Sequence, residues 1–390
     1  MAGVSAGYTQ WRIGLARPDV GEEEIEAVSR VLRTPILTNG PETAGFEREF
    51  ADLHRAEHGV AFANGTVALV ALFAALGIGP GDEVIVPSLT FVSSATSIVY
   101  AGATPVFADV DPDTFNLDPA DVARRMSPRV KGILAVHYGG QPADLAELSA
   151  LAADAGVVLL EDAAEAHGAR YRGRHVGTWG VAGMFSFTPT KNITTGEGGM
   201  VLTGDGDLAR QLRLLRNHGQ VSPYEHAVLG CNWRLSEMQA AMGRAQTAKL
   251  DAILARKRTL AAHLDRRLDP VAGVQAPVVR DDRDHVHMLY TVTLASADAA
   301  RRDAVINDLA QQGIESRVYF PPVHRQPIFR GQPADVPVTD DLAGRILSLP
   351  IHSLLTPEDM ADVAAALAAA MDRTAASPTT ATTATTAPTW

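Results

Sequence analysis

The chain has 390 residues, of which 46% are hydrophobic and 20% are charged, a composition typical of globular proteins. Its formal net charge of −11 argues against a nucleic-acid-binding protein, and its hydrophobic runs are too short to span a membrane. The single cysteine, Cys231, excludes an internal disulfide framework. Because residues 1–20 also lack the apolar stretch of a signal peptide, we expect a cytoplasmic protein.

The first part of the chain, residues 1–250, alternates helical patterns with short apolar runs bounded by Gly, Pro and Asp. Strands that alternate with helices form a mostly parallel sheet covered on both faces, so we expect a large α/β/α domain. The predicted helices cover residues 22–33, 42–54, 67–77, 93–102 and 144–156, and the predicted strands cover 58–63, 83–87, 105–110, 132–137, 157–162, 185–187 and 199–203.

A long helical pattern over residues 236–268 predicts a connection to a second domain. We expect this smaller C-terminal α+β domain to cover residues 251–373. Residues 374–390 are rich in Thr, Ala and Pro and have too little apolar surface to offset the entropy of ordering, which predicts a disordered tail. In the small domain, strands are predicted at 288–294 and 314–319 and helices at 299–313 and 357–371.

Lys191 is the lysine whose surroundings suggest chemistry. Of the four lysines, Lys249 and Lys257 fall on the long helical pattern, where exposed positions are expected, and Lys131 precedes a strand. Lys191 instead lies in FSFTPTKNITTGEGG, a Thr- and Gly-rich loop of the kind that lets backbone approach a ligand closely. A loop lysine that is buried can attack a carbonyl as the neutral amine, and a merely exposed lysine is the alternative.

Two carboxylates stand where a buried strand ends, because VVLLEDAAEAHGA places Glu161 and Asp162 at the end of the run over 157–162. Ligands of parallel sheets bind at the carboxyl ends of strands. Asp162 either caps a following helix or pairs with the protonated ring nitrogen of pyridoxal 5′-phosphate (PLP), which keeps that ring an electron sink. Glu165 would reach the ring oxygen of the same cofactor or face water.

The segment FANGTVALVALFAALG predicts a strand, a tight turn and a helix, with Asn64, Gly65 and Thr66 at the helix N-terminus. Backbone N–H groups and the helix dipole favour an anion such as a phosphate there, although an ordinary N-cap has the same pattern. Ser186 would donate its hydroxyl to the same phosphate. Phe91 follows the next strand, where it either stacks on a cofactor ring or belongs to the core.

In their order and spacing, these motifs resemble the DegT/StrS sugar aminotransferases, a family of fold-type I PLP enzymes. The resemblance runs from Arg12 to Met371 and implies an aspartate-aminotransferase-like α/β fold. It also implies a homodimer with active sites at the subunit interface. The segments that carry it are LTNGPETAGFEREFA, ANGTVAL, VPSLTFVSSAT, PVFADVDPDTFNLD, VHYGGQPADL, EDAAEAHGA, FSFTPTKNITTGEGG, LGCNWRLSEMQAA and LSLPIH.

The resemblance assigns roles position by position. Lys191 is similar to the lysine that holds PLP covalently, Asp162 to the partner of the pyridine nitrogen, and Glu165 to the neighbour of the ring oxygen, where Gln or His is also common. Asn232 resembles a residue that reaches the cofactor phosphate of the other subunit, although its own context favours a turn. The remaining cofactor positions are Gly65, Thr66 and Ser186 at the phosphate and Phe91 on the ring.

The activity implied by the resemblance is transfer of an amino group from L-glutamate or glutamine to a nucleotide-linked keto-6-deoxy sugar. A keto-cyclitol of the scyllo-inosose type is the alternative acceptor. A branch of the family has histidine in place of the lysine and catalyses dehydration, so Lys191 favours amino transfer. The candidates for substrate contact are the cationic residues Arg216, His218, Arg234, Arg317 and His324, together with Tyr319.

A nicotinamide-dependent sugar oxidoreductase is the rival with a similar alternation of strands and helices. It requires GxGxxG in its first strand–helix turn, whereas the nearest run here, LGIGPGDEV, follows a helix and precedes a strand. A metal site is not predicted either, because the sequence contains neither HExxH nor paired cysteines.

Overall fold

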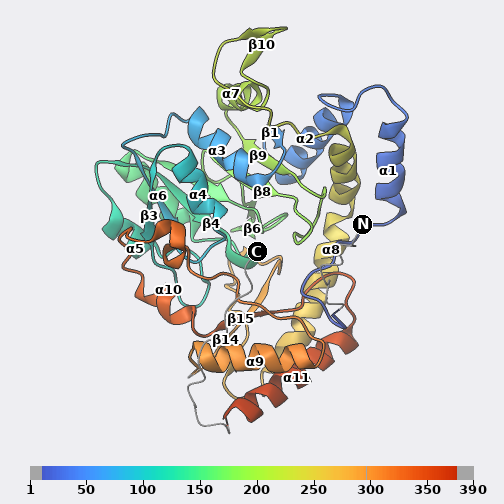
Figure 1. Ribbon diagram of the computed structural model, residues 1–390, viewed down its shortest axis with the longest axis vertical. Helices are drawn as coiled ribbons and strands as arrows, with labels where there is room; N and C mark the ends of the chain where they lie inside the picture. The colour runs from blue at the N-terminus through green and yellow to red at the C-terminus, as the bar shows by residue number, and fades with distance from the viewer. Residues whose placement is uncertain (1–10, 296, 376–390) are drawn as a thin grey trace, which may run out of the picture.

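The computed structural model describes residues 11–295 and 297–375 and centres on a seven-stranded sheet (Figure 1). The strand order is β1-β9-β8-β5-β4-β2-β3. Strand β9 is antiparallel to both neighbours and the other pairs are parallel, which confirms the predicted mostly parallel sheet. The strands are β1 His58–Phe62, β2 Glu83–Pro87, β3 Thr104–Ala108, β4 Val130–Val136, β5 Val158–Asp162, β8 Ala182–Ser186 and β9 Gly199–Thr203.

Alternate residues of these strands enter two different hydrophobic cores. In β5, Leu159 packs in one core and Leu160 in the other. Both faces of the sheet are therefore covered, which explains why its strands are continuous apolar runs in the sequence. Helices α2 (Pro41–His54), α5 (Pro119–Arg125) and α6 (Leu145–Ala155) cover the first face, and α3 (Gly65–Ala75), α4 (Ser93–Tyr100) and α7 (Gly206–Arg216) cover the second.

The long helix α8 (Glu237–Leu268) extends from the large sheet to the C-terminal part of the chain (Figure 1). A capping box between Ser236 and Gln239 begins it. Leu260 and Leu264, near its end, share a core with a second sheet. This sheet contains β12 (Val274–Gln275), β14 (Tyr290–Leu294) and β15 (Ile346–Leu349), and it packs with α9 (Ala299–Gln311) and α11 (Pro357–Ala375).

The remaining helices and strands lie outside the two sheets described above. Helix α1 (Glu22–Leu32) packs against α8, and a hairpin of β10 and β11 projects beyond α7 (Figure 1). These elements are β6 Arg170–Tyr171, β7 Arg174–His175, β10 Gln220–Ser222, β11 Glu225–His226, β13 Arg283–Asp284 and α10 Pro337–Leu342, with short 3₁₀ helices η1 Tyr138–Gly140, η2 Val323–Arg325 and η3 Pro327–Phe329.

Two predicted boundaries are wrong. Residues 314–319 do not form the expected strand, because the chain makes only isolated bridges at Ile314 and Arg317 while β15 already pairs with β14. Helix α11 continues through Ala375, so it includes the first two residues of the predicted tail. The rest of that tail, 376–390, lies outside the described residues, and the limits of the two domains stay a prediction.

The expected exposure of Lys257 is also wrong. Lys257 is buried, because it occupies the stripe of α8 that contains Leu250, Ile253 and Leu260 and packs against the rest of the protein. Lys249 lies beside that stripe, and its partly exposed side chain forms an ion pair with Glu24.

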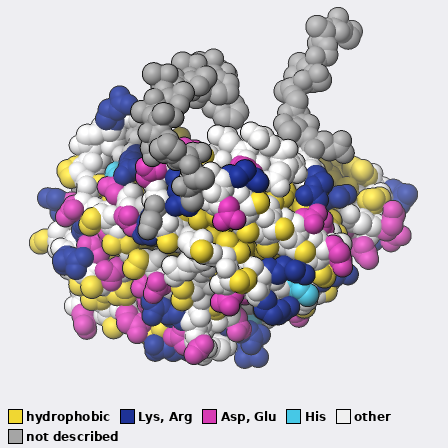
Figure 2. All heavy atoms as spheres, turned by 90° about the horizontal axis from the view of Figure 1, so that it is seen from below, with side chains coloured by type: hydrophobic (Ala, Val, Ile, Leu, Met, Phe, Trp, Pro, Cys, Tyr) yellow, Lys and Arg dark blue, Asp and Glu magenta, His cyan; other side chains and the backbone are white. Residues whose placement is uncertain are grey.

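The face of the molecule shown in Figure 2 intersperses acidic, basic and hydrophobic side chains. Within the described ranges, none of the helices combines the length and apolar character needed to cross a bilayer.

Candidate active site

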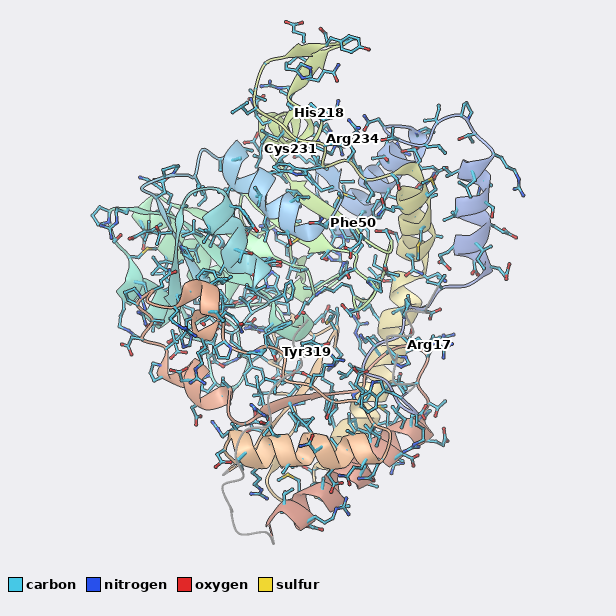
Figure 3. All side chains as sticks on the ribbon, in the orientation of Figure 1. Arg17, Phe50, His218, Cys231, Arg234 and Tyr319 are labelled. Carbon is cyan, nitrogen blue, oxygen red and sulfur yellow. The ribbon has the colours of Figure 1, made fainter. Side chains whose placement is uncertain are left out.

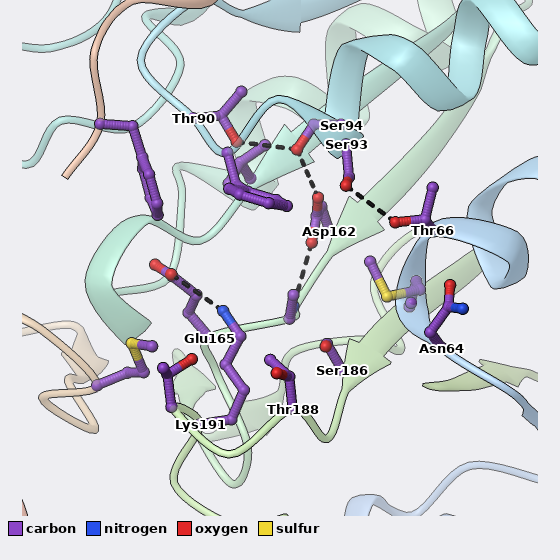
Figure 4. Close-up of a pocket in the computed structure, with 18 of the residues that line it drawn as sticks. Asn64, Thr66, Thr90, Ser93, Ser94, Asp162, Glu165, Ser186, Thr188 and Lys191 are labelled. Carbon is purple, nitrogen blue, oxygen red and sulfur yellow. Dashed lines mark hydrogen bonds and ion pairs between the residues drawn. The ribbon is translucent and has the colours of Figure 1, made fainter. Parts of the chain in front are cut away.

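A cavity of about 670 Å³ lies at the carboxyl ends of β1, β2, β4, β5 and β8 (Figure 4). This is the edge at which parallel sheets bind ligands, because the loops after neighbouring strands converge there. Two segments from the C-terminal part of the chain close the opposite wall, one with Met288 and Leu289 and one with Tyr319 and Phe320.

Asp162, the last residue of β5, is a buried carboxylate at one side of this cavity. Ser94 Oγ donates to its Oδ2 over 2.7 Å, and Ala164 N donates to its Oδ1 over 3.2 Å. Ser94 in turn shares a hydrogen bond of 2.9 Å with Thr90 Oγ1. Burial raises the pKa of Asp162 despite these donors, because the buried negative charge is poorly solvated. A cation placed next to the carboxylate would therefore stabilise its ionised form.

Lys191 reaches the cavity from the loop after β8 (Figure 4). Its Nζ donates to Glu165 Oε1 over 3.2 Å, and the other oxygen of Glu165 accepts from Gly139 N over 2.8 Å. Lys191 N also donates to Thr188 O, which closes the turn from which the side chain projects. The amine is therefore held in one direction, toward the interior of the cavity.

The start of α3 supplies an anion-binding corner. Asn64 caps the helix by accepting from Val67 N over 3.0 Å, so Gly65 and Thr66 form the first turn, whose N–H groups favour an anion. A Cβ at Gly65 would approach the Met184 sulfur to 3.0 Å, which leaves little room for any side chain there. Ser186, at the end of β8, lines the same corner.

The remaining wall is aromatic and apolar. Phe91 is 55% exposed and its ring centroid lies 5.8 Å from that of Phe320. Tyr138 OH donates to the backbone oxygen of Tyr319, and burial raises the pKa of Tyr138, so this phenol stays protonated. Such a wall excludes water and offers flat faces for a ring.

The structure brings most of the predicted site residues together, and they come from five separate segments of the chain. Those that line the cavity are Gly65, Thr66, Phe91, Asp162, Glu165, Ser186, Lys191 and Tyr319.

Six predicted residues lie outside the cavity lining, namely Arg216, His218, Asn232, Arg234, Arg317 and His324. Asn232 is exposed and pairs with Asn217 in an isolated bridge, and Arg234 donates to the Asn217 side chain over 2.6 Å. His324 bonds to Ser88 Oγ over 2.7 Å. In Figure 3, Arg234 and His218 lie near α7 and the hairpin, far from Tyr319.

Two other cationic candidates have partners of their own. Arg216 forms an ion pair with Glu47 and also donates to the backbone of β1, and Arg317 is paired with Glu315. Neither arginine lines the cavity.

The sequence prediction missed the hydroxyl residues Thr90, Ser93 and Ser94. Ser93 accepts from Thr66 Oγ1 over 2.9 Å, and Ser94 supports Asp162. All three belong to VPSLTFVSSAT, so a run of hydroxyls directly after the β2 strand was the available signal.

The fold and the cavity define an α/β enzyme of the aminotransferase type, with an amine and a buried carboxylate facing one ring-sized space. Residues 18–368 match the DegT/DnrJ/EryC1/StrS aminotransferase family, and the chain belongs to this family. The family predicted from the sequence motifs is thereby confirmed.

Individual relatives of the chain support this assignment. The chain is 41% identical over 362 residues to GDP-perosamine synthase of Caulobacter vibrioides, covering 91% of this chain and 97% of that protein. It is 41% identical over 341 residues to a dTDP-3-amino-3,4,6-trideoxy-alpha-D-glucose transaminase of Streptomyces venezuelae, covering 86% and 89%. The crystal structure of S. venezuelae DesV with a ketimine intermediate superposes with a TM-score of 0.86, at 40% identity, covering 90% and 94%. The chain is thus a PLP-dependent sugar aminotransferase, as predicted.

The residues present fit PLP. The cavity offers a lysine amine for the aldehyde, a buried carboxylate for the ring nitrogen, and a corner with hydroxyls and a helix N-terminus for the phosphate. A side chain at position 65 would be too close to Met184, so glycine is the residue that fits there. Without a side chain at this position, an anion can approach the backbone closely.

Proposed function

We propose that the enzyme transfers an amino group from L-glutamate or glutamine to a nucleotide-linked keto-6-deoxy sugar, in the cytoplasm, with PLP bound covalently to Lys191. The observation that carries this proposal is the placement of the Lys191 amine and the buried Asp162 carboxylate on one cavity. The names of the relatives support the acceptor class, because GDP- and dTDP-linked amino sugars appear in them.

When bound, PLP supplies an electron sink that stabilises negative charge on the carbon beside the reacting nitrogen. Lys191 would have two tasks: its Nζ would hold the cofactor, and as a free amine the same Nζ would accept and return a proton at the donor carbon. Glu165 keeps the amine pointed into the cavity through the 3.2 Å contact.

Asp162 would keep the ring nitrogen protonated, and Ser94 orients the carboxylate for this contact. Thr66 and Ser186, together with the backbone at Gly65, would hold the phosphate. Phe91 would lie against the ring.

The acceptor would face the wall made by Met288, Leu289, Tyr319 and Phe320. A deoxy sugar suits this largely apolar wall, because it carries a methyl group where other hexoses carry a hydroxyl.

The experiment starts with the absorbance of the purified protein and its reduction by borohydride, followed by peptide mapping. The cofactor should be fixed on Lys191. L-Glutamate and L-glutamine are then tested as donors against GDP-, dTDP- and UDP-linked keto sugars and keto-cyclitols, with products identified by mass. Amination of a nucleotide-linked keto sugar is expected with ping-pong kinetics. Amination of keto-cyclitols alone would contradict the proposed acceptor, and reduction at another lysine would contradict the site.

The proposal includes a homodimer in which Asn232 contacts the cofactor phosphate of the second subunit. Its exposed position beside the hairpin is compatible with this role. Mixing Lys191→Ala and Asn232→Ala protomers tests this arrangement. After subunit exchange, about half of the dimers are heterodimers, and each heterodimer has one site in which both residues are unchanged. Up to about a quarter of all sites should therefore regain activity. Failure to regain activity after demonstrated exchange would exclude shared sites.

A further inference from the structure

Lys257, in the middle of α8, is a buried lysine that the proposed chemistry does not use. Its side chain is 4% exposed, and its Nζ donates to Asn192 Oδ1 over 2.6 Å. This partner is a neutral amide, whereas Lys249 on the same helix lies 2.8 Å from the carboxylate of Glu24. Burying an ammonium against a neutral group costs free energy, so this position calls for a reason beyond helix stability.

Asn192 connects Lys257 to the loop that carries Lys191. It follows Lys191 directly in the chain, and its Nδ2 donates to Val286 O over 3.3 Å. Lys257 therefore holds one end of the Asn192 amide and the backbone at Val286 holds the other. These two bonds restrain the Asn192 side chain, which belongs to the loop from which Lys191 projects.

Lys257 and Lys191 also share a small space. A cavity of about 10 Å³, close to the size of one water molecule, is lined by both lysines, Asn192 and His352. The carboxylate of Glu165, which accepts from Lys191 Nζ, acts electrostatically on Lys257 as well. The two amines thus line one small cavity and lie near one carboxylate.

The groups that face Lys257 come from every element around it. They are Glu165 and His167 after β5, His285 and His287 before β14, His352 after β15, and Arg17 and Asp19 in the N-terminal segment, while Arg258, the next residue on α8, acts on His287. Burial lowers the pKa of His287 to about 3 and of His352 to about 4, and it lowers that of His285 well below its usual value. These histidines are therefore neutral near pH 7.

We propose that Lys257 is a positioning residue for Lys191: through Asn192 it fixes the loop of Lys191, and when protonated it favours the neutral, nucleophilic amine at position 191. A second cation nearby disfavours the ammonium form of a lysine. The inference rests on the proposed role of Lys191.

The charge of Lys257 changes near neutral pH. Burial lowers its pKa to about 7, with Glu165 opposing the shift. Below about pH 7 the protein should behave like a variant with a permanent cation at 257, and above it like a variant with a neutral side chain.

The test uses apoprotein and trace labelling with acetic anhydride, with acetylation at Lys191 measured by peptide mass spectrometry against exposed Lys131 as internal reference. At pH 6, wild type and Lys257→Arg should label Lys191 about four- to fifteenfold faster than Lys257→Met, the effect expected of one unit charge for a separation on the order of 10 Å at an effective dielectric of ~20 to 40. At pH 8.5, wild type should match Lys257→Met, while Lys257→Arg stays faster.

Lys249→Met is the matched control, because it removes a lysine from the same helix; it should follow wild type at both pH values. Equal labelling of wild type and Lys257→Met at pH 6, or the same loss in Lys249→Met, would overturn the proposal. If Lys257→Met does not fold, wild type and Lys257→Arg are compared at pH 8.5, where equal rates would overturn it. Because labelling needs no cofactor, its result is separate from whether PLP is found on Lys191.

Discussion

Two buried polar regions flank Lys191, and they have opposite chemistry. On the cavity side, Asp162 and Glu165 are carboxylates that accept hydrogen bonds from hydroxyl and backbone donors. On the α8 side, Lys257 and His287 are bases whose pKa values are lowered by burial. Acids supported by donors stand on one side of the amine, and desolvated bases stand on the other.

The difference shows how one lysine can be both held and kept reactive. In the proposed function, the carboxylates would orient the amine and attract a cationic ring nitrogen. Among the bases, His287 is neutral near pH 7, so Lys257 is the base on the α8 side whose charge would act on Lys191 at that pH. Changes on the cavity side should therefore affect turnover most, and changes on the α8 side should affect stability and pH dependence.

The largest effect is expected for Lys191→Ala. Turnover should fall by at least about 10⁴-fold, because covalent attachment and proton transfer are both lost. The absorption band of bound PLP should disappear as well. Lys131→Ala, at an exposed position of β4, serves as the control and should retain both. If Lys191→Ala kept its activity, Lys191 would not be the reactive lysine, and the comparison of the two regions that flank it would lose its basis.

Asp162→Asn should lower kcat by about 10²- to 10³-fold, the effect of losing a buried charged partner. Because burial raises the pKa of Asp162, its stabilising contribution is present at low pH and lost as pH rises through that pKa. The neutral variant should thus melt at a higher temperature than wild type at pH 7 as apoprotein. Thermal unfolding and steady-state kinetics measure the two effects.

Asp109→Asn is the matched control for that variant. Asp109 is an equally buried carboxylate, but it accepts from Val338 N and Thr339 outside the cavity. Its replacement should lower stability and leave kcat per folded molecule unchanged. A fall in kcat similar to that of Asp162→Asn would mean that any buried carboxylate matters equally.

Ser94→Ala should reduce kcat by about three- to tenfold, because it removes the hydroxyl donor of Asp162. Ser97→Ala, on the same helix, removes only a hydrogen bond to Ser94 O and should stay close to wild type. Initial rates at saturating substrate separate the two. Equal rates would show that the support of Asp162 does not depend on this hydroxyl.

Lys257→Met should raise the free energy of unfolding by about 1–3 kcal/mol at pH 6 to 7, after subtracting the donor lost to Asn192. The pKa is about 7 when folded and 10.5 as a free lysine, so the cost of burial is complete below pH 7 and vanishes as pH rises to 10.5. The gain in the free energy of unfolding of Lys257→Met should therefore become smaller as pH rises from 7 to 10.5. Lys249→Met should instead lose up to about 1 kcal/mol with its ion pair. Urea titrations across this range measure both, and a gain independent of pH would contradict the interpretation.

The cavity side was predictable because its residues follow local signals. Asp162 ends an apolar strand, and Gly65 and Thr66 begin a helix directly after a strand and a turn. Residues that follow a strand of a parallel sheet lie at its carboxyl edge, so their place in the site could be predicted from the sequence. The role of Ser94 was not predictable in this way, because its contact with Asp162 joins residues 68 positions apart.

The α8 side was harder to predict. A lysine on a helix is usually exposed, and that general expectation outweighed the spacing of Lys257 from Leu250 and Leu260, which places it on the buried stripe. Its partner Asn192 belongs to a distant segment, as do His287 and His352. Bases that meet only through tertiary packing leave no pattern in the sequence.

The cavity collects residues from Asn64 through Phe320, which lies late in the chain. During synthesis the nascent polypeptide therefore has no finished binding chamber until Phe320 has emerged from the ribosome. A message interrupted before that codon yields a product that lacks one wall of the chamber.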